Sequence, residues 1–239
     1  MGHDEGTSEL TPREHALLFG VLARSVVARL GVERGAETLR RLVWRYGRER
    51  GRRMALRAER RGCALDWVSY LAFGEWRASE GSQESQTLAT TPDLVKHVTR
   101  CPWHAAWVEA ELLPWGRHYC LSIDNALVDG FNPELRLDVD ATLSNGDEAC
   151  VFRYRGADMT PARSGALLAL RASLGDGAIR DWAFHMGHVW SAAQRVLRDE
   201  LGDGAEPILA AAHSDLQRAC AEDVARVVLE SVPADPLAI

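Results

Sequence analysis

The sequence predicts an α+β protein in which an antiparallel sheet packs against N-terminal and C-terminal helices. Apolar residues recur at helical spacing through residues 1–78 and again through residues 157–239. Residues 88–156 instead carry strand patterns, with an Asn145-Gly146 pair between two alternating segments. A chain of 239 residues is long enough to bury an extensive core. We therefore expect a single domain, 1–239, with a helical start, a sheet core and a helical end.

Composition and charge exclude several functional classes. The net charge of -6 gives no overall attraction to nucleic acid or to an anionic membrane. No apolar run approaches the roughly 20 residues that cross a bilayer, and the first residues lack the features of a signal peptide. Five cysteines, an odd number, do not resemble a secreted disulfide framework. We expect a cytoplasmic protein with free thiols that binds a small molecule, and we expect it to form a homodimer.

The first helix is predicted to begin at a capping box and to end at a glycine. Thr11 can cap, Pro12 suits the first helical position, and Glu14 can reach back to the cap. An apolar stripe follows at helical spacing and ends at Gly31; it comprises Leu18, Leu22, Val26 and Leu30.

A second, strongly basic helix is predicted from Gly35 to Gly62. Its buried face comprises Leu39, Leu42, Val43 and Tyr46. Its arginines are Arg40, Arg41, Arg45, Arg48, Arg50, Arg52, Arg53, Arg57, Arg60 and Arg61. A phosphate or nucleic-acid contact is one interpretation, but few aromatic residues are interleaved for base stacking. We favour a solvated helix face whose charge is partly balanced by glutamates.

The middle of the chain is predicted to alternate between short helices and strands. Residues 63–77 continue as a helical piece, 79–87 form a polar loop, and 93–100 form a strand. Residues 102–112 form a short helix, and Pro114-Trp115-Gly116 turns out of it. His118 to Asp124 alternates apolar and polar side chains and is predicted to be a strand with one polar face.

Residues 135–154 are predicted to form a hairpin. A two-residue turn at Asn145-Gly146 places Val139 opposite Phe152 and Ala141 opposite Cys150. The sequence then predicts a helix over 181–200, which stops at Gly202, and a last helix over 206–230.

Five segments together resemble the L-2-amino-thiazoline-4-carboxylic acid hydrolase family. They are Tyr46-Gly47-Arg48-Glu49-Arg50-Gly51, Arg100-Cys101-Pro102, Tyr119-Cys120-Leu121-Ser122-Ile123-Asp124, Gly130-Phe131-Asn132-Pro133 and Gly146-Asp147-Glu148-Ala149-Cys150-Val151-Phe152. The last segment also resembles the 4-vinyl-reductase-type domains, which are similar in fold to transport-particle subunits. Both resemblances imply an antiparallel sheet packed against helices. The first implies hydrolytic opening of a thiazoline ring to an N-carbamoyl cysteine.

Hydrolysis of a cyclic amidine-type carbon requires a nucleophile, a group that moves protons and donors for developing charge. We expect Cys120 or Cys150 as the nucleophile, Asp124 as proton acceptor or amine anchor, and His104 as a base for a thiol. On a regular strand, Cys120 and Asp124 would lie about 13 Å apart, so a turn beginning at Asp124 is needed to join them. The predicted substrate-binding residues are Asn132, Cys101, Trp103 and His118.

Each residue also has a structural interpretation. Free cysteine is usually buried as a small apolar residue, and Asp124 or Asn132 can begin a turn. A metal is not predicted, because the chain lacks a Cys-x-x-Cys or His-x-x-x-His pair, and the zinc-ligand positions of some relatives hold Thr142 and Val139 here. No organic cofactor is predicted. Two other functions stay open: a non-catalytic small-molecule-binding module, and a ring-opening lyase acting on a larger aromatic ligand.

Overall fold

The computed structural model describes residues 10–239 and confirms the α+β class, with a four-stranded antiparallel sheet between N-terminal and C-terminal helices. The α-helices are α1 (Pro12–Leu30), α2 (Val32–Arg60), α3 (Trp67–Ala72), α4 (Pro102–Glu109), α5 (Leu113–Cys120), α6 (Ile123–Phe131), α7 (Pro161–Leu174), α8 (Trp182–Leu201), α9 (Ala205–Ala219) and α10 (Glu222–Glu230). The strands are β1 (Glu84–Ala89), β2 (Leu94–Arg100), β3 (Leu137–Ala141) and β4 (Cys150–Tyr154).

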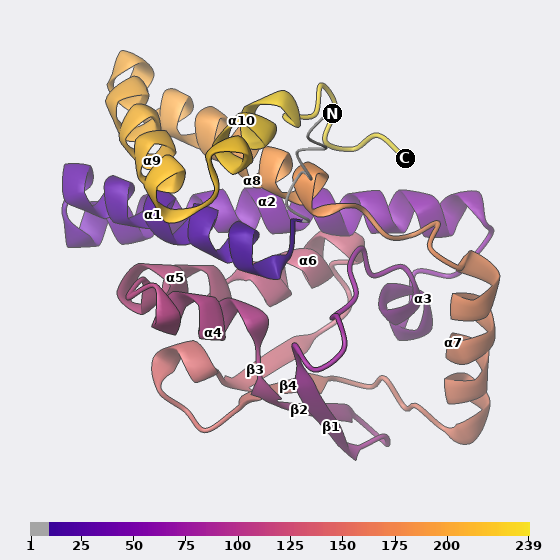
Figure 1. Ribbon diagram of the computed structural model, residues 1–239. Coiled ribbons are helices and arrows are strands. Elements are labelled where there is room, and N and C mark those ends of the chain that lie inside the picture. Colours follow the sequence, from indigo (N-terminus) through magenta and orange to yellow (C-terminus); the bar gives the residue numbers. More distant parts are fainter. Residues whose placement is uncertain (1–9) are drawn as a thin grey trace, which may run out of the picture.

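The elements form three layers, which Figure 1 shows from the side. The C-terminal helices α8, α9 and α10 pack with α1 and the long α2. The short helices α4, α5 and α6 lie on the other side of α1 and α2, and the sheet lies beyond them. Short helices from the middle of the chain therefore separate the helical layer from the strands.

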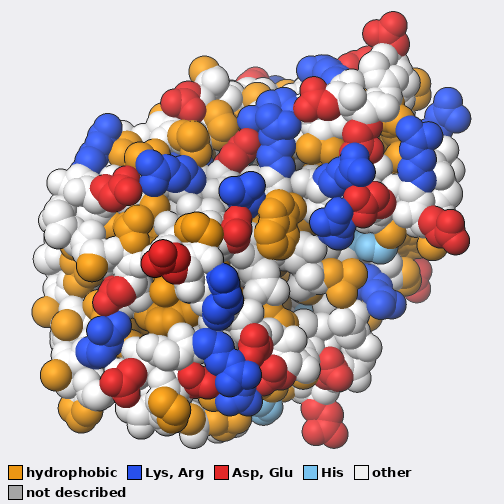
Figure 2. Space-filling model, turned by 180° about the vertical axis from the view of Figure 1, so that it is seen from behind, with side chains coloured by type: hydrophobic (Ala, Val, Ile, Leu, Met, Phe, Trp, Pro, Cys, Tyr) orange, Lys and Arg blue, Asp and Glu red, His pale blue; other side chains and the backbone are white. Residues whose placement is uncertain are grey.

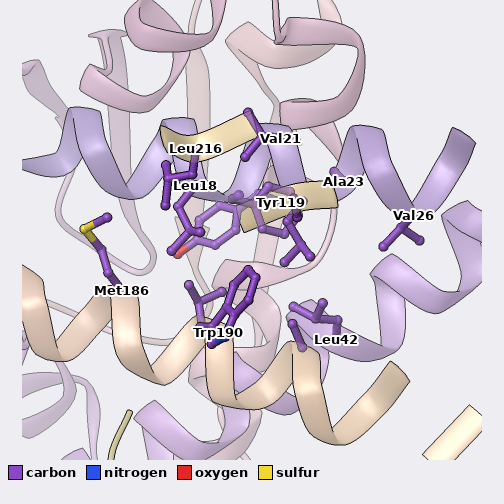
Figure 3. Close-up of a cluster of buried hydrophobic side chains, with 14 of the residues drawn as sticks. Leu18, Val21, Ala23, Val26, Leu42, Tyr119, Met186, Trp190 and Leu216 are labelled. Atoms are coloured by element: carbon purple, nitrogen blue, oxygen red, sulfur yellow. The ribbon is translucent and has the colours of Figure 1, made fainter. Parts of the chain in front are cut away.

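The main core lies between α1, α2, α5, α8 and α9. Leu18 and Val21 of α1 meet Tyr119 of α5 and Trp190 of α8 in the close-up of Figure 3, and these four side chains are all buried. The predicted capping box is confirmed, because the Thr11 side chain and Glu14 satisfy each other's backbone groups at the start of α1. The second helix begins at Val32, three residues earlier than predicted.

Helices α2 and α6 make an unusually close contact through small residues. A Cβ atom on Gly47 would lie 2.6 Å from the Ala126 Cβ, and one on Gly51 would lie 2.1 Å from the Leu127 carbonyl oxygen. On α6, a Cβ on Gly130 would lie 2.2 Å from the Arg48 carbonyl oxygen. Because no real Cβ approaches so closely, the two backbones can touch only while these positions are glycine.

The sheet has the strand order β1-β2-β4-β3, with every neighbouring pair antiparallel. The predicted pair Val139–Phe152 is confirmed, and Asp138 lies opposite Arg153. Ala141 pairs with Val151 rather than with Cys150, because the register shifts between Val139 and Ala141. The connection is also longer than two residues: Leu143–Asn145 form a 3-10 turn, and the Asp147 carboxylate accepts a 2.7 Å hydrogen bond from the Thr142 N–H.

The prediction of a strand at 118–124 is wrong, and these residues belong to α5, a short turn and the start of α6. The alternation of Tyr119, Leu121 and Ile123 suggested one apolar face, but Leu121 is 51% exposed. Apart from Ser122, the buried positions instead follow spacings of three and four residues, and they are Leu112, Gly116, Tyr119, Ile123 and Ala126. This is the period of a helix, and Pro114 lies in the first turn of α5 rather than in a turn after α4.

Three other predicted boundaries differ from the structure. Residues 84–89 form strand β1 rather than a loop; almost all of β1 is exposed because it is an edge strand paired only with β2, so its sequence carries no apolar signal. The helical piece at 63–77 is limited to α3. The last predicted helix is divided into α9 and α10. None of the helices described over residues 10–239 has the length and apolar character needed to cross a membrane.

Candidate active site

A helix-turn-helix corner brings Cys120 and Asp124 closer than a strand would. Cys120 is the last residue of α5, and Asp124 lies in the first turn of α6. An acidic side chain at a helix N-terminus is favoured by the exposed N–H groups and the helix dipole. The turn that the sequence analysis required between the thiol and the carboxylate is therefore present, although it joins helices.

Two other elements carry thiols to the same corner. Cys101 follows β2 and precedes α4, and Cys150 begins β4, where it pairs with Val98 of β2. The charge on Cys101, on Asp124 and on Cys150 influences the pKa of Cys120, and the charge on Cys101 and on Asp124 also influences that of Cys150. Cys101, Cys120, Cys150 and Asp124 therefore lie within electrostatic range of one another, and we call these four residues the thiol–carboxylate site.

The carboxylate of this site is poised near neutral pH. Burial raises the pKa of Asp124 to about 6, and the nearby charge of Arg50 opposes that rise. Among the described side chains, none forms a hydrogen bond or an ion pair with the Asp124 carboxylate. An acid with a pKa close to the working pH can both accept and return a proton.

The three thiols are held mainly in the neutral form. Burial raises the pKa of Cys120 well above its ordinary value, and it raises that of Cys150 to about 11 although the Leu143 N–H lies 3.4 Å from the Cys150 Sγ. Burial also raises the pKa of Cys101, but two N–H groups at the start of α4 oppose the rise. They approach the Cys101 thiol without the geometry of a full capping hydrogen bond. Cys101 is thus the thiol with the most helix-derived support for a negative charge.

Arg50 and three tyrosines surround the site, and sequence analysis did not identify them as site residues. Tyr70 and Tyr154 have raised pKa values, mainly through burial and in part through the charge of Asp124. Burial, Tyr46 and the charge of Asp124 raise the pKa of Tyr119 well above its ordinary value, and the charge of Arg50 opposes this rise. The charge of Arg50 opposes the rise in the pKa of Asp124, so a guanidinium acts on the carboxylate of the site.

The placement of Arg50 corrects the view that the basic face of α2 is wholly solvated. Arg50 and Arg53 are buried, and Glu75, which is also buried, binds Arg53 through two hydrogen bonds of 2.6 and 2.7 Å. The Glu75 carboxylate also accepts hydrogen bonds from Arg50, at 3.2 Å, and from Arg57, at 3.5 Å. We call these four residues the Arg–Glu75 cluster. One carboxylate shared by three guanidiniums leaves net positive charge, and Arg50 is the member whose charge influences the pKa of Asp124.

Outside this cluster, much of the basic face is exposed and paired as expected. Glu37 pairs with Arg40 and Arg41, and Glu59 pairs with Arg52. On the molecular face shown in Figure 2, basic and acidic side chains are likewise interspersed.

The close α2–α6 contact explains how Arg50 reaches Asp124. Arg50 directly precedes Gly51 on α2, and Asp124 lies two residues before Ala126 on α6. Because Gly47 and Gly51 let the α6 backbone approach, the side chains next to them lie within electrostatic range of the start of α6. The glycines of the Tyr46–Gly51 segment are therefore packing residues that serve the site.

Trp103 and Asn132, predicted to bind substrate, have their polar groups engaged by the fold. The Trp103 Nε1 donates a 3.0 Å hydrogen bond to the His15 Nδ1 inside the core. The Asn132 amide donates to the Leu65 carbonyl at 2.8 Å and accepts from the Glu134 N–H at 2.9 Å. Asn132 also caps the far end of α6, about 12 Å from Asp124 by helical rise. Both side chains hold neighbouring elements together.

His104 and His118 lie on the helices that flank the site. Burial lowers the pKa of both imidazoles, which favours the neutral form at neutral pH. Among residues 10–239, no hydrogen bond joins either ring to a thiol or to Asp124. The link between His104 and the site is its backbone N–H, which lowers the pKa of Cys101.

The thiols and the carboxylate are not arranged to bind a metal. Within the described part of the chain, no three His, Cys, Asp or Glu side chains form a group that could hold an ion. A separate hollow of about 710 Å³ lies at the molecular surface, lined by Trp76, Trp182, Arg180 and other residues, with no member of the thiol–carboxylate site.

The sequence model of the L-2-amino-thiazoline-4-carboxylic acid hydrolase family matches residues 12–154. The matched region runs from the start of α1 to the end of β4 and includes all four residues of the thiol–carboxylate site. No curated protein and no solved structure matches the chain.

Proposed function

The chain belongs to the L-2-amino-thiazoline-4-carboxylic acid hydrolase family, and from this premise we propose that it hydrolyses a small cyclic C–N/C–S substrate of the thiazoline type at the thiol–carboxylate site. The observation that carries the proposal is Asp124: it lies in the first turn of α6, no side chain within residues 10–239 forms a hydrogen bond or ion pair with it, burial raises its pKa to about 6, and its charge influences Cys101, Cys120 and Cys150. A buried carboxylate kept near its pKa is costly to the fold, and such costs are concentrated at functional sites.

The charges of the site match the chemistry of an amino-thiazoline acid. Its ring amidine can pair with the Asp124 carboxylate, and its carboxylate can pair with the Arg50 guanidinium. The charge of Arg50 is only partly neutralised by Glu75, because the same carboxylate also binds Arg53 and Arg57. Two oppositely charged anchors then orient the ring between α2, α6 and the thiols.

We assign Cys101 as the nucleophile, because the start of α4 supports its thiolate. Its Sγ attacks the carbon between the ring nitrogen and the ring sulfur, and Asp124 accepts the thiol proton. The bond from that carbon to the ring sulfur breaks, and the departing sulfur takes the proton from Asp124. Water then attacks the same carbon with Asp124 as base and releases Cys101. Over the cycle, the water oxygen becomes the carbamoyl oxygen, and its two protons end on the former ring nitrogen and ring sulfur.

The first experiment measures ring opening of L-2-amino-thiazoline-4-carboxylate by the purified protein. The product should be 18 mass units heavier, the mass of one water, and should carry a new thiol. We expect Cys101→Ser to lower kcat by at least about 100-fold. Cys63→Ser and Cys220→Ser are matched controls, because these free cysteines contribute no charge to the site, and they should retain wild-type rates. Full activity of Cys101→Ser would remove Cys101 from the mechanism.

One observation favours a non-catalytic binding module as a second function. Burial raises the pKa of all three thiols, which suits neutral side chains that line a ligand pocket. In that case the protein binds the thiazoline without opening it, and Cys101→Ser keeps the affinity of wild type. Isothermal titration calorimetry together with the turnover assay separates the two functions.

A further inference from the structure

Two buried hydrogen bonds join Trp103, His15 and Tyr46. The Trp103 Nε1 of α4 donates to the His15 Nδ1 of α1 at 3.0 Å, and the His15 Nε2 lies 3.2 Å from the Tyr46 Oη of α2. Trp103 is 7% exposed, His15 is 1% exposed and Tyr46 is 0% exposed, so water does not compete for these hydrogen bonds. The chemistry of the Trp103 indole fixes which atom donates and which accepts in both hydrogen bonds.

An indole nitrogen can only donate a hydrogen bond. The His15 Nδ1 must therefore be the acceptor, and it carries no proton. A neutral imidazole then holds its single proton on Nε2, which donates to the Tyr46 Oη. A second proton is strongly disfavoured, because burial and the charges of Arg50 and His188 lower the pKa of His15 to about 3. Trp103 thus fixes His15 as one tautomer.

The orientation of the Tyr46 hydroxyl follows from this tautomer. Since its oxygen accepts from His15, its own proton must point away from His15. The Tyr119 ring centroid lies 6.4 Å from that of Tyr46, and Arg50, a cation with donors only, does not accept this proton. The Arg50 Cζ lies 5.4 Å from the centre of the Tyr46 ring, one helical turn along α2. Tyr119 in turn lies beside Cys120 and is within the electrostatic reach of Asp124. The Tyr46 proton is therefore available to an acceptor other than His15, and the neighbouring Tyr119 connects Tyr46 to the helix that ends at Cys120.

We propose that Trp103 and His15 lock Tyr46 as a permanent hydrogen-bond donor, and that Tyr46 acts with Arg50 to hold the negative charge of the bound substrate. His15 and Trp103 are positioning residues that act through Tyr46. The second half of this proposal rests on the proposed function, whereas the tautomer lock does not.

The lock is tested by nitrogen NMR of the histidine rings in the full-length protein at neutral pH. The His15 signals, assigned by their loss in His15→Gln, should show a protonated Nε2 and an unprotonated Nδ1. In Trp103→Phe, which removes the indole donor and keeps an aromatic ring, His15 should lose this single tautomer. A proton on Nδ1 in wild type overturns the lock, whether or not the protein turns over a thiazoline.

The role of the lock in binding is tested with L-2-amino-thiazoline-4-carboxylate. Trp103→Phe should raise KM about tenfold, which is the effect of losing one hydrogen bond to the substrate. It should change kcat less than about twofold. Trp107→Phe is the matched control: Trp107 is also buried, and its Nε1 donates at 2.7 Å to the Ala16 carbonyl of the same helix. Its KM should stay at the wild-type value even if both variants unfold more readily.

A conservative replacement completes the test. His15→Gln keeps an acceptor for Trp103 and a donor for Tyr46 and should retain most of the affinity, whereas His15→Leu should match Trp103→Phe. Equal KM values for Trp103→Phe and Trp107→Phe, or no difference between the two His15 variants, overturn the binding role. If wild type neither binds nor opens the thiazoline, the proposed function and this binding role both fail, and the NMR result alone decides the lock.

Discussion

Asp124 is the residue on which the chemical account depends. Its carboxyl is ionised in water at neutral pH, but burial raises its pKa to about 6 in the folded protein. The folded protein therefore favours the protonated form more strongly than the unfolded chain does. This preference costs stability wherever the group is charged, as expected for a residue kept for chemistry.

Asp124→Asn should abolish turnover and also stabilise the protein. The variant lacks the proton acceptor, so we expect kcat to fall by at least about 100-fold. It also lacks the buried charge, so its free energy of unfolding at pH 7.5 should rise by up to about 2 kcal/mol. The stability gain should shrink as the pH falls from 6 toward 4, where wild-type Asp124 becomes protonated. Urea denaturation at both ends of this range measures the effect, and a destabilised variant at pH 7.5 would contradict the assignment.

Sequence reasoning identified part of this site and missed the rest for physical reasons. It named Cys101, Cys120, Cys150 and Asp124, whose charges act on one another in the fold, and their roles stay predictions. It missed Arg50, because one arginine among ten in a basic helix carries no local sign of burial. Its partner Glu75 lies 25 residues away and outside any motif, so only the tertiary structure identifies the pair.

At the scale of elements, the site depends on how closely two helices approach. The α2–α6 contact is made by Gly47, Gly51 and Gly130, and it places Arg50 beside the first turn of α6. The alternation over 118–124 suggested a strand, because Leu121 happens to fall in phase with Tyr119 and Ile123. The longer helical period from Leu112 to Ala126 was the better guide, since a short apolar run is ambiguous between strand and helix.

Gly51→Ala should separate these helices. The added Cβ would lie 2.1 Å from the Leu127 carbonyl oxygen and 2.7 Å from the Phe131 nitrogen, and backbone cannot yield as a flexible side chain can. We expect a loss of at least about 2 kcal/mol in the free energy of unfolding, together with weaker substrate binding through Arg50.

Gly165→Ala in α7 is the control for helix propensity. No atom lies within 4 Å of the new Cβ, so the substitution should raise stability by about 0.5 to 1 kcal/mol. The account of the helix contact fails if Gly51→Ala is as stable as Gly165→Ala.

The whole molecule holds several buried groups that respond to acid. Burial lowers the pKa of His15 to about 3 and that of His188 to about 4, and it lowers that of His185 well below its ordinary value. The same groups in the unfolded chain take up protons near pH 6.5. The unfolded state therefore binds more protons than the folded state below pH 6.5, and the stability that these histidines contribute above that pH is lost as the pH falls.

Stability should consequently fall steeply between pH 6.5 and about 4. Three histidines act in this direction, while Asp124 acts in the opposite direction between pH 6 and about 4. A net difference of roughly two protons gives a slope of about 2 to 3 kcal/mol per pH unit near pH 5. In Asp124→Asn the opposing carboxyl group is absent. The difference in bound protons then grows by about one, and the slope should steepen by about 1.4 kcal/mol per pH unit. Urea unfolding at half-unit pH steps checks both slopes, and a flat profile from pH 7 to 5 would show that the histidines are not held neutral.

The most direct test of the central claim is a crystal structure of Asp124→Asn with L-2-amino-thiazoline-4-carboxylate. We predict that the ligand lies between α2 and α6, with its carboxylate on Arg50, its ring amidine toward position 124 and its ring carbon facing the Cys101 Sγ. A ligand bound instead in the hollow lined by Trp76 and Trp182, or thiols and position 124 found in separate environments, would contradict the account.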